Sequence, residues 1–335
     1  MATTRHSPPV AAGEPIGVVE APGREAAAEL LVPRDTGHVG IVGATESGKS
    51  HTLKTLARAL ARQGAAVLVL DWEGEHSDIA SHALEPWQVR VPVLNYPDPR
   101  RVVEALEAAL RVHGDHYSLS PLMAQLLAKT LARTRRRVRS LVEELEKLAE
   151  NTPRADTRTS THALLRRLWA LQPVLEQLEP GPDKKLDPAS PQPGKIYTID
   201  LSGLTPSQKK TYTQLLATHL QANKQATTLL YLAVEEAHHT AQPGTPLEQL
   251  LLEARKKNIR LITLTSHPTP LHHNQQTIIA HQQPDTESAK RLAEHLAPEP
   301  RAKQALTKTL LSLETGEAIV KIGASKPVLA KIKPI

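Results

Sequence analysis

Hydrophobic positions along the chain alternate between short apolar runs and longer stretches with helical spacing. A short strand is expected at residues 16–20, and an apolar run at 38–42 ends in a glycine-rich turn. From 49 to 63 leucines and alanines recur three or four positions apart, which predicts a helix with Gly64 at its C-cap. The run at 65–70 then indicates a buried strand. Strand, glycine loop, helix and strand within about 35 residues form a βαβ unit, which predicts a parallel sheet.

Beyond residue 100 the strands are interrupted by a long helical stretch. Residues 101–178 have helical spacing with a break at 151–153, and a proline-rich stretch follows them. Strand patterns then return in four segments, at 196–201, 228–234, 259–265 and 277–281. Two last apolar runs, at 317–322 and 327–332, flank Gly323 and predict a C-terminal β-hairpin.

These elements predict one α/β domain with a helical insertion. The N-terminal segment at 1–36 holds at most a partial strand. The core is expected at 37–100 and 196–335, with the hairpin at its end, and the insertion with its proline-rich linker at 101–195. The sheet should be parallel, with helices on both faces.

Composition limits the chemistry and the location of the protein. The chain has 335 residues, of which 40% are hydrophobic and 23% charged, enough to form a buried core. It has no cysteine, which excludes disulfides, thiolate metal sites and a thiol nucleophile. No apolar run approaches the ~20 residues that cross a bilayer, and the N-terminus lacks the apolar region of a signal peptide. We therefore expect a soluble, cytoplasmic protein with no membrane partner.

The charge balance favours a polyanionic partner. Lysine and arginine number 41 against 35 aspartates and glutamates, a formal net charge of +6. Aromatic side chains are few, with three tryptophans, five tyrosines and no phenylalanine. RNA-binding sheets and oligonucleotide-binding barrels stack bases on aromatic side chains, so this composition argues against those classes.

Residues 43–50 carry the strongest chemical signal. Their sequence, Gly-Ala-Thr-Glu-Ser-Gly-Lys-Ser, satisfies G-x-x-x-x-G-K-[ST] between an apolar strand and an amphipathic helix, which is the context of a phosphate-binding loop. Backbone N–H groups of such a loop point at phosphate oxygens, and the helix N-terminus adds its positive end. Lys49 is expected to reach the β- and γ-phosphates, and Ser50 to bind Mg²⁺. The predicted nucleotide contacts are Gly43, Ala44, Thr45, Glu46, Ser47, Gly48, Lys49, Ser50 and His51.

Three apolar strands end in acidic residues that could complete a nucleotide site. These are Asp71, Asp200 and the pair Glu235–Glu236. Asp71 alone would serve as the magnesium-side acid of a kinase-like site. Hydrolysis also needs a group that orients or deprotonates water, and the glutamate pair offers one carboxylate for the metal and a second for the water.

The order of these motifs resembles the HerA branch of the HerA/FtsK superfamily of hexameric DNA-pumping ATPases. After the phosphate loop the resemblance rests on LDWEGEH (70–76), IDLS (199–202), VEEAH (234–238), EARKK (253–257), LTSHP (264–268) and GEAIV (316–320). It covers nearly the whole chain from about residue 15. It implies a RecA/FtsK-like P-loop fold that binds ATP and Mg²⁺ and acts on double-stranded DNA as a homo-hexamer.

The resemblance also implies a role for each site residue. Lys49 and Ser50 match the phosphate-loop lysine and hydroxyl. Glu235 matches the metal-binding Walker B acid, and Glu236 matches the catalytic glutamate. Arg255 stands where the family carries a basic residue that reaches the neighbouring subunit's nucleotide. Arginines supplied in this way accelerate phosphoryl transfer by ~10³–10⁵ in other systems; otherwise Arg255 is an ordinary cation at a helix end, in the predicted helix 246–257.

Two departures from the family pattern bear on function. Ser266-His267 stand where the family usually has Gln-Arg, which weakens γ-phosphate sensing by the shorter Ser266, although His267 could substitute. The segment at 1–36 is too short for the full β-barrel of cellular members, which is associated with docking the nuclease NurA. We therefore expect a motor without a full barrel. It would serve either DNA-end processing with a NurA-like nuclease or the packaging or transfer of a viral or mobile-element genome.

Two other functions stay open from the sequence. ATP could control assembly rather than drive motion, which the Ser266-His267 departure favours. The chain could also be a small-molecule kinase, with Asp71 as the metal-side acid and the helices at 101–178 as a lid. Substitutions of Asp71 and Glu236 separate the kinase from the motor, because each function depends on a different acid.

Two further clusters are interpreted as structural. A basic run is predicted on a helix, where side chains about 100° apart do not all face one phosphate backbone. It comprises Arg133, Arg135, Arg136, Arg137 and Arg139, with Glu143, Glu144 and Glu146 as counter-charges. His238-His239 and His272-His273 are adjacent pairs whose side chains should diverge on a strand or loop. Because no third ligand is placed beside either pair, we expect no metal site there.

Overall fold

A computed structural model describes residues 13–19, 28–134, 137–224, 227–268 and 275–334. The strands are β1 (Gly13–Val19), β2 (Ala28–Pro33), β3 (Val39–Val42), β4 (Ala66–Asp71), β5 (His82–Leu84), β6 (Ile196–Asp200), β7 (Leu230–Val234), β8 (Ile259–Thr265), β9 (Thr277–Ala280), β10 (Glu317–Ile322) and β11 (Val328–Ile332). The helices are α1 (Lys49–Arg62), α2 (Pro99–Arg111), α3 (Pro121–Leu131), α4 (Val138–Asn151), α5 (Ala155–Leu178), α6 (Pro206–Asn223), α7 (Pro246–Glu253), α8 (Thr286–Leu296) and α9 (Pro300–Ser312).

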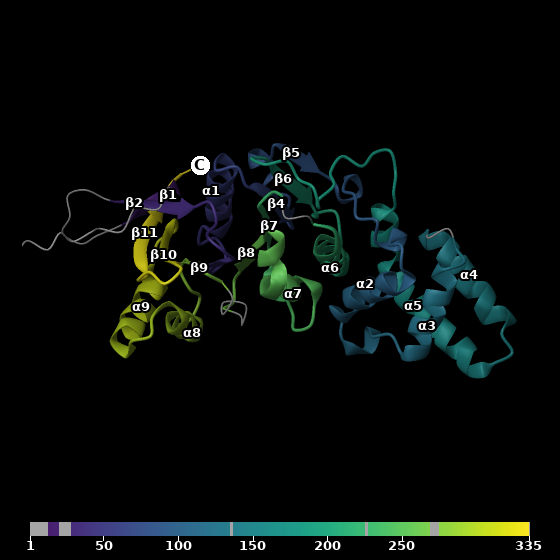
Figure 1. The fold of residues 1–335 in the computed structure, drawn as a ribbon. Coiled ribbons are helices and arrows are strands. Elements are labelled where there is room, and N and C mark those ends of the chain that lie inside the picture. The colour runs from purple at the N-terminus through teal and green to yellow at the C-terminus, as the bar shows by residue number, and fades with distance from the viewer. Residues whose placement is uncertain (1–12, 20–27, 135–136, 225–226, 269–274, 335) are drawn as a thin grey trace, which may run out of the picture.

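All of these strands belong to one sheet with a parallel and an antiparallel half. Neighbours are parallel throughout the order β9-β3-β8-β7-β4-β6-β5. Beyond β9 the strands β10, β11, β1 and β2 extend the sheet with antiparallel pairing (Figure 1). The predicted α/β fold with a parallel core and a C-terminal hairpin is confirmed. β2 and β5 are not predicted by the sequence pattern, because both are edge strands with exposed residues and β5 has only three residues.

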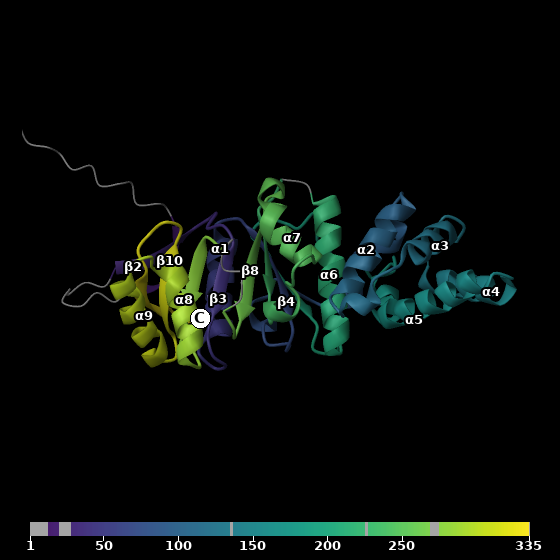
Figure 2. The ribbon, with the colours of Figure 1, turned by 90° about the horizontal axis from the view of Figure 1, so that it is seen from below.

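Helices cover both faces of the sheet, as predicted. α1 lies on one face, and α6, α7, α8 and α9 lie on the other (Figures 1 and 2). Alternate residues of β4 show how the faces differ. Val67 and Val69 belong to the apolar cluster that contains Leu53 of α1, whereas Leu68 belongs to the cluster that contains Leu215 of α6. Successive strand side chains point to opposite faces, so a fully apolar strand such as β4 requires cover on both sides.

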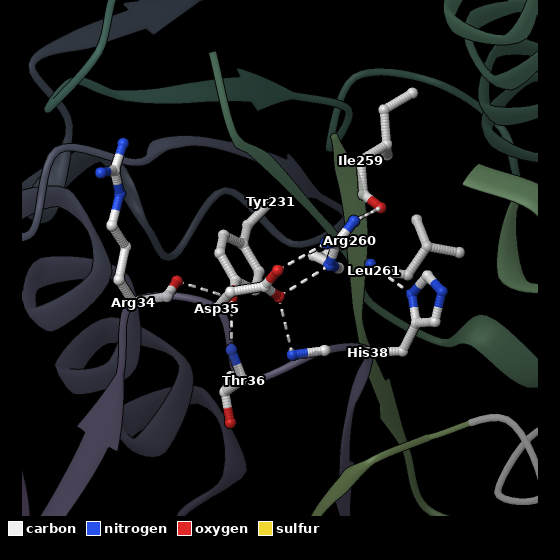
Figure 3. A network of polar contacts seen from close by, with 9 residues as sticks. Arg34, Asp35, Thr36, His38, Tyr231, Ile259, Arg260 and Leu261 are labelled. Atoms are coloured by element: carbon white, nitrogen blue, oxygen red, sulfur yellow. Dashed lines mark hydrogen bonds and ion pairs between the residues drawn. The ribbon is translucent and has the colours of Figure 1, made fainter. Parts of the chain in front are cut away.

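A polar network ties the beginnings of the central strands together, at the end of the sheet away from the phosphate loop (Figure 3). Arg260 of β8 is 4% exposed and donates to both carboxylate oxygens of Asp35, at 2.8 and 2.6 Å. The Tyr231 hydroxyl of β7 donates to Arg34 O and accepts from Thr36 N–H, each at 3.0 Å. These bonds hold residues 34–36, which precede β3, against β7 and β8.

The helices between β5 and β6 form a bundle at one end of the molecule (Figures 1 and 2). α2 packs against α6 of the core, α3 packs against α2 and α5, and α4 packs against α5. The basic run does not lie on one helix, contrary to the prediction. Arg133 and Arg137 lie in the connection between α3 and α4, and Arg139 lies in α4. Arg135 and Arg136 lie outside the described residues.

The predicted helix at 246–257 also ends earlier than expected. α7 stops at Glu253, and Ala254–Lys257 form a 3₁₀ turn. The 3₁₀ turn is wound more tightly than α7. Asn258 follows it with a left-handed φ of 53° and leads into β8. Among the helices in the described part of the chain, none combines the length and apolar character needed to cross a bilayer.

Candidate functional site

The phosphate loop lies between β3 and α1, as its motif predicts. Gly48 precedes the first turn of α1 with a left-handed φ of 103°. The Gly43 N–H donates to Thr265 O at the end of β8 (3.2 Å), and the Ala44 N–H donates to Gln282 O just after β9 (2.7 Å). These two bonds anchor the loop to the strands on both sides of β3.

Close packing explains why position 43 is glycine. A Cβ on Gly43 would lie 2.6 Å from both His281 Cβ and Ser47 Oγ. Ser47 is buried, and its Oγ has no hydrogen-bond partner among the described residues. Buried hydroxyls without a partner are uncommon in native proteins. Such an atom fits a loop that receives a polar ligand.

Lys49 links the loop to the acidic side of the site. Its Nζ donates to Ala44 O at 2.7 Å, across the loop. Burial lowers the pKa of Lys49 below its ordinary 10.5, and the charges of Glu236 and Glu235 act against that lowering. Both acids are therefore near enough to act on the Lys49 ammonium. The loop and the glutamate pair share one site beyond the carboxyl ends of the parallel strands, where this fold class binds ligands.

His281 supports the loop from beneath, and the sequence analysis did not identify it. Its Nδ1 lies 2.8 Å from Glu317 O, and its Nε2 lies 2.8 Å from Thr52 Oγ1. A carbonyl oxygen only accepts, so Nδ1 carries the proton and Nε2 accepts from the Thr52 hydroxyl. Burial lowers the pKa of His281 to about 4, and the charges of Lys49 and His51 act in the same direction. No motif marks this histidine; its bonds join Thr52 of α1 to Glu317 of β10, which are far apart in the chain.

Glu235 is held by two donors from the segment after β4. The Trp72 N–H donates to Glu235 Oε2 at 2.9 Å, and His76 Nε2 lies 2.7 Å from Glu235 Oε1. His76 is fully buried. Burial lowers the pKa of His76, but the hydrogen bond to Glu235 and the charges of Glu235 and Asp71 outweigh it and raise the pKa above its ordinary 6.5. The carboxylate at the end of β7 is therefore fixed in position.

Asp71 organises this segment. Its Oδ1 accepts from the N–H groups of Gly74 (2.8 Å) and Glu75 (3.0 Å), and its Oδ2 accepts from the His76 N–H (2.8 Å). The side chain is buried. Both oxygens are thus used by the backbone of the same loop, and the loop in turn presents Trp72 and His76 to Glu235. Asp71 accepts three hydrogen bonds and Glu235 accepts two, so Asp71 has fewer lone pairs left for a metal ion.

Glu236 differs from Glu235 in backbone and in exposure. It has a left-handed φ of 47° and begins the 3₁₀ turn η5 (Ala237–His239). Its side chain is 40% exposed, and its Oε2 lies 3.3 Å from His238 Nδ1. Strained backbone of this kind clusters at functional sites. The turn directs one carboxylate of the pair inward to Trp72 and His76, and leaves the other open to solvent.

Three histidines surround Glu236. The rings of His238 and His239 have centroids 3.9 Å apart, and His267, after β8, stacks on His238 at 5.4 Å. Burial lowers the pKa of His238 to about 4, with further lowering by His239, His267 and Lys210. The expectation that the side chains of His238 and His239 diverge is therefore wrong, because a 3₁₀ turn, rather than a strand or open loop, carries them.

The remaining predicted site residues lie around this centre. Ser50 and His51 are in the first turn of α1, and His51 Nε2 lies 2.8 Å from Lys333 O. Ser266 Oγ lies 2.9 Å from His267 Nδ1. Arg255 lies in the 3₁₀ turn after α7, and its side chain is outside what the structure describes, as are His272 and His273.

The residues present fit a magnesium nucleotide. Backbone N–H groups at the α1 N-terminus and Lys49 suit phosphate oxygens. Ser50 and Glu235 are hard oxygen donors, which Mg²⁺ prefers. A phosphate loop between β3 and α1, with acids at the end of β7 in a parallel sheet, defines the P-loop NTPase class.

Within this class the chain belongs to the family described as "Helicase HerA, central domain", which matches residues 16–220. The match ends before Glu235, Glu236 and Arg255. No curated protein matches the chain.

Solved structures agree on the fold. VirB4 of Thermoanaerobacter pseudethanolicus is similar over 100% of this chain and 99% of its own, with 17% identity and a TM-score of 0.70. The plasmid coupling protein TrwB in complex with the ATP analogue ADPNP is similar over 98% of this chain and 96% of its own, with 14% identity and a TM-score of 0.69. TrwB in complex with ADP and Mg²⁺ has a TM-score of 0.68 at 14% identity, over 97% and 96% of the two chains.

Proposed function

We propose that the chain is a Mg²⁺-dependent ATPase that moves double-stranded DNA, working as a homo-hexameric ring. One observation carries this proposal: Glu236 stands open to solvent beside the phosphate loop while Glu235 is held inward. An ATPase needs a solvent-accessible carboxylate to act on water. Family membership and the fold shared with VirB4 and TrwB support the extension from hydrolysis to DNA movement.

Each residue has a distinct task in this proposal. The loop backbone and Lys49 bind the phosphates, and Ser50 and Glu235 hold the Mg²⁺ side of the site. The bound Mg²⁺ supplies charge neutralisation on the phosphate oxygens. Glu236 accepts a proton from the attacking water. Arg255 reaches the nucleotide of the next subunit, where an arginine stabilises the charge of the transition state.

The net charge of +6 suits a DNA backbone. Contacts to phosphates are sequence-independent and weaken with salt, because binding releases counterions. We place the protein in the cytoplasm. We propose two settings for the motor: DNA-end processing with a NurA-like nuclease, and packaging or transfer of a viral or mobile-element genome.

Steady-state ATP hydrolysis tests the proposal, with and without linear double-stranded DNA at about 50 and about 200 mM salt. We expect DNA to stimulate turnover and salt to reduce the stimulation. Lys49→Ala and Glu236→Gln should abolish turnover, and Glu236→Gln should still bind ATP. Lys54→Ala is the matched control, because Lys54 lies on the same helix and pairs with Asp78 at 2.7 Å outside the loop.

Other outcomes would support the alternatives. ATP binding with negligible, DNA-independent turnover in the wild type would favour an ATP-controlled assembly switch. Loss of activity in Asp71→Asn with activity retained in Glu236→Gln would favour a kinase.

A further inference from the structure

We propose that Glu236, His238 and His239 form a binding site for a transition-metal ion of the Zn²⁺ class, and that a metal bound there stops hydrolysis. The three residues each offer one ligand atom, and these atoms lie within 4.8 Å of one another. The binding site stands on geometry alone. Its inhibitory effect rests on the proposed function, in which Glu236 acts on water.

The turn after β7 brings the three donors together. The His239 N–H donates to Glu236 O at 2.9 Å, which holds these two residues together across the turn. His238, between them, is directed back to Glu236, with Nδ1 3.3 Å from Oε2. His267 stacks on the His238 ring and holds it in this orientation. A dense donor set therefore arises from four consecutive residues.

The spacing matches the size of a zinc site. Zn²⁺ binds imidazole nitrogen and carboxylate oxygen at about 2.0–2.2 Å, so two ligands of a tetrahedral ion are about 3.3–3.5 Å apart. The measured separation of Glu236 Oε2 and His238 Nδ1 is 3.3 Å. Donors that lie within 4.8 Å need to approach by at most about 1.5 Å to reach that spacing. His239 is exposed, and its ring centroid lies 3.9 Å from that of His238 and 6.2 Å from that of Trp72.

The donor types select the metal. Two imidazoles and one carboxylate suit Zn²⁺, Co²⁺ or Ni²⁺, whereas Mg²⁺ takes octahedral oxygen ligands. Such an ion would bind the lone pair of His238 Nδ1, and water would fill the fourth position. The Thr265 hydroxyl lies 3.3 Å from His238 Nδ1 and 3.0 Å from His267 O, so it can donate to the carbonyl and leave the nitrogen lone pair to the metal. The site is therefore distinct in chemistry from the Mg²⁺ side of the nucleotide.

A metal on Glu236 has a direct consequence for the reaction. The carboxylate lone pair that binds the metal is no longer free to accept a proton from water. The phosphate loop is built from other residues, so nucleotide binding should persist. Zn²⁺ should thus block hydrolysis without displacing ATP.

Metal binding is tested on the full-length protein without nucleotide or Mg²⁺. Zn²⁺ titration calorimetry and the visible absorption of four-coordinate Co²⁺ are the two readouts. We expect one site per chain, with affinity at least tenfold lower in His239→Ala and unchanged in His162→Ala, an exposed histidine of α5. Equal affinity in His239→Ala and the wild type would overturn the proposal. Loss of metal binding in His76→Gln and in no other variant would also overturn the proposal. The metal would then bind the buried group of Asp71, His76 and Glu235.

Inhibition is measured separately, so that its failure is distinguishable from failure of the proposed function. If the wild type hydrolyses ATP, Zn²⁺ should inhibit this hydrolysis and a zinc-selective chelator should restore it. His239→Ala should need at least tenfold more Zn²⁺ for half-inhibition. Zn²⁺ bound at this site with undiminished turnover would overturn the inhibitory role. If the wild type does not hydrolyse ATP, the proposed function fails while the binding test keeps its meaning.

Discussion

Replacement of His76 tests how firmly Glu235 is held. The ring is fully buried, with Nε2 2.7 Å from Glu235 Oε1. His76→Leu removes the donor and leaves a buried carboxylate oxygen, whereas His76→Gln can keep a donor at that point. A hydrogen bond to a charged group contributes about 1.5–3 kcal/mol. We therefore expect the free energy of unfolding of His76→Leu to be lower than that of His76→Gln by about 1.5–3 kcal/mol.

The pH dependence tests the charge on this histidine. Burial lowers the pKa of His76, but the hydrogen bond to Glu235 and the charges of Glu235 and Asp71 raise it above its ordinary value. A raised pKa in the folded state stabilises the protein below the pKa of the unfolded state, and this contribution is lost as pH rises through the folded pKa. The stability advantage of the wild type over His76→Gln should be largest below the ordinary histidine pKa of 6.5 and shrink as the pH rises above it.

Urea unfolding followed by tryptophan fluorescence gives these free energies. The buffer contains EDTA, so that no metal competes with His76 for Glu235. His162→Gln is the control for loss of an exposed histidine. Equal stability of His76→Leu and His76→Gln at low pH would refute the reasoning about the hydrogen bond. A wild-type advantage that stays constant as the pH rises would refute the reasoning about the charge.

Three further predictions follow from other contacts. Asp71→Asn replaces a carboxylate that accepts hydrogen bonds from three backbone N–H groups. Urea unfolding should show a free energy of unfolding lower by about 1–3 kcal/mol. Gly48 and Gly64 have left-handed φ angles of 103° and 83°, so Gly48→Ala and Gly64→Ala should each lower the free energy of unfolding by about 1–2 kcal/mol. Titration with a fluorescent ATP analogue should show weaker binding for Gly48→Ala only. Asp35→Ala takes the carboxylate from Arg260 and should lower the unfolding free energy by about 1–3 kcal/mol, with ATP affinity unchanged because the pair lies at the opposite end of the sheet.

The local parts of this molecule were predictable from the sequence. The phosphate loop occupies a short segment whose strand, glycines and helix are all encoded in neighbouring residues. The central strands β4, up to Leu70, and β7 are continuous apolar runs, because both of their faces are covered. The placement of the glutamate pair beside the loop follows from the parallel order of the strands.

The contacts that position the site were not predictable in the same way. His76 and His281 meet their partners Glu235 and Thr52 only through pairing and packing of strands far apart in the chain. Asp71 has the same sequence context as a metal-binding acid, and only the loop conformation shows that its oxygens are used by backbone N–H groups. The basic run is predicted on a helix because it lies within the long stretch of helical spacing at 101–178, whereas Arg133 and Arg137 lie between α3 and α4.

Movement along DNA is the central claim, and displacement of a triplex strand measures it directly. A linear duplex carries a third strand at one position, and release of that strand is followed over time. The wild type with Mg²⁺ and ATP should release it, with a delay that grows with the length of duplex to be crossed. Glu236→Gln with ATP, and the wild type with a non-hydrolysable analogue, should not. No release by a wild type whose ATP hydrolysis is stimulated by DNA, or equal release by Glu236→Gln, would contradict the account.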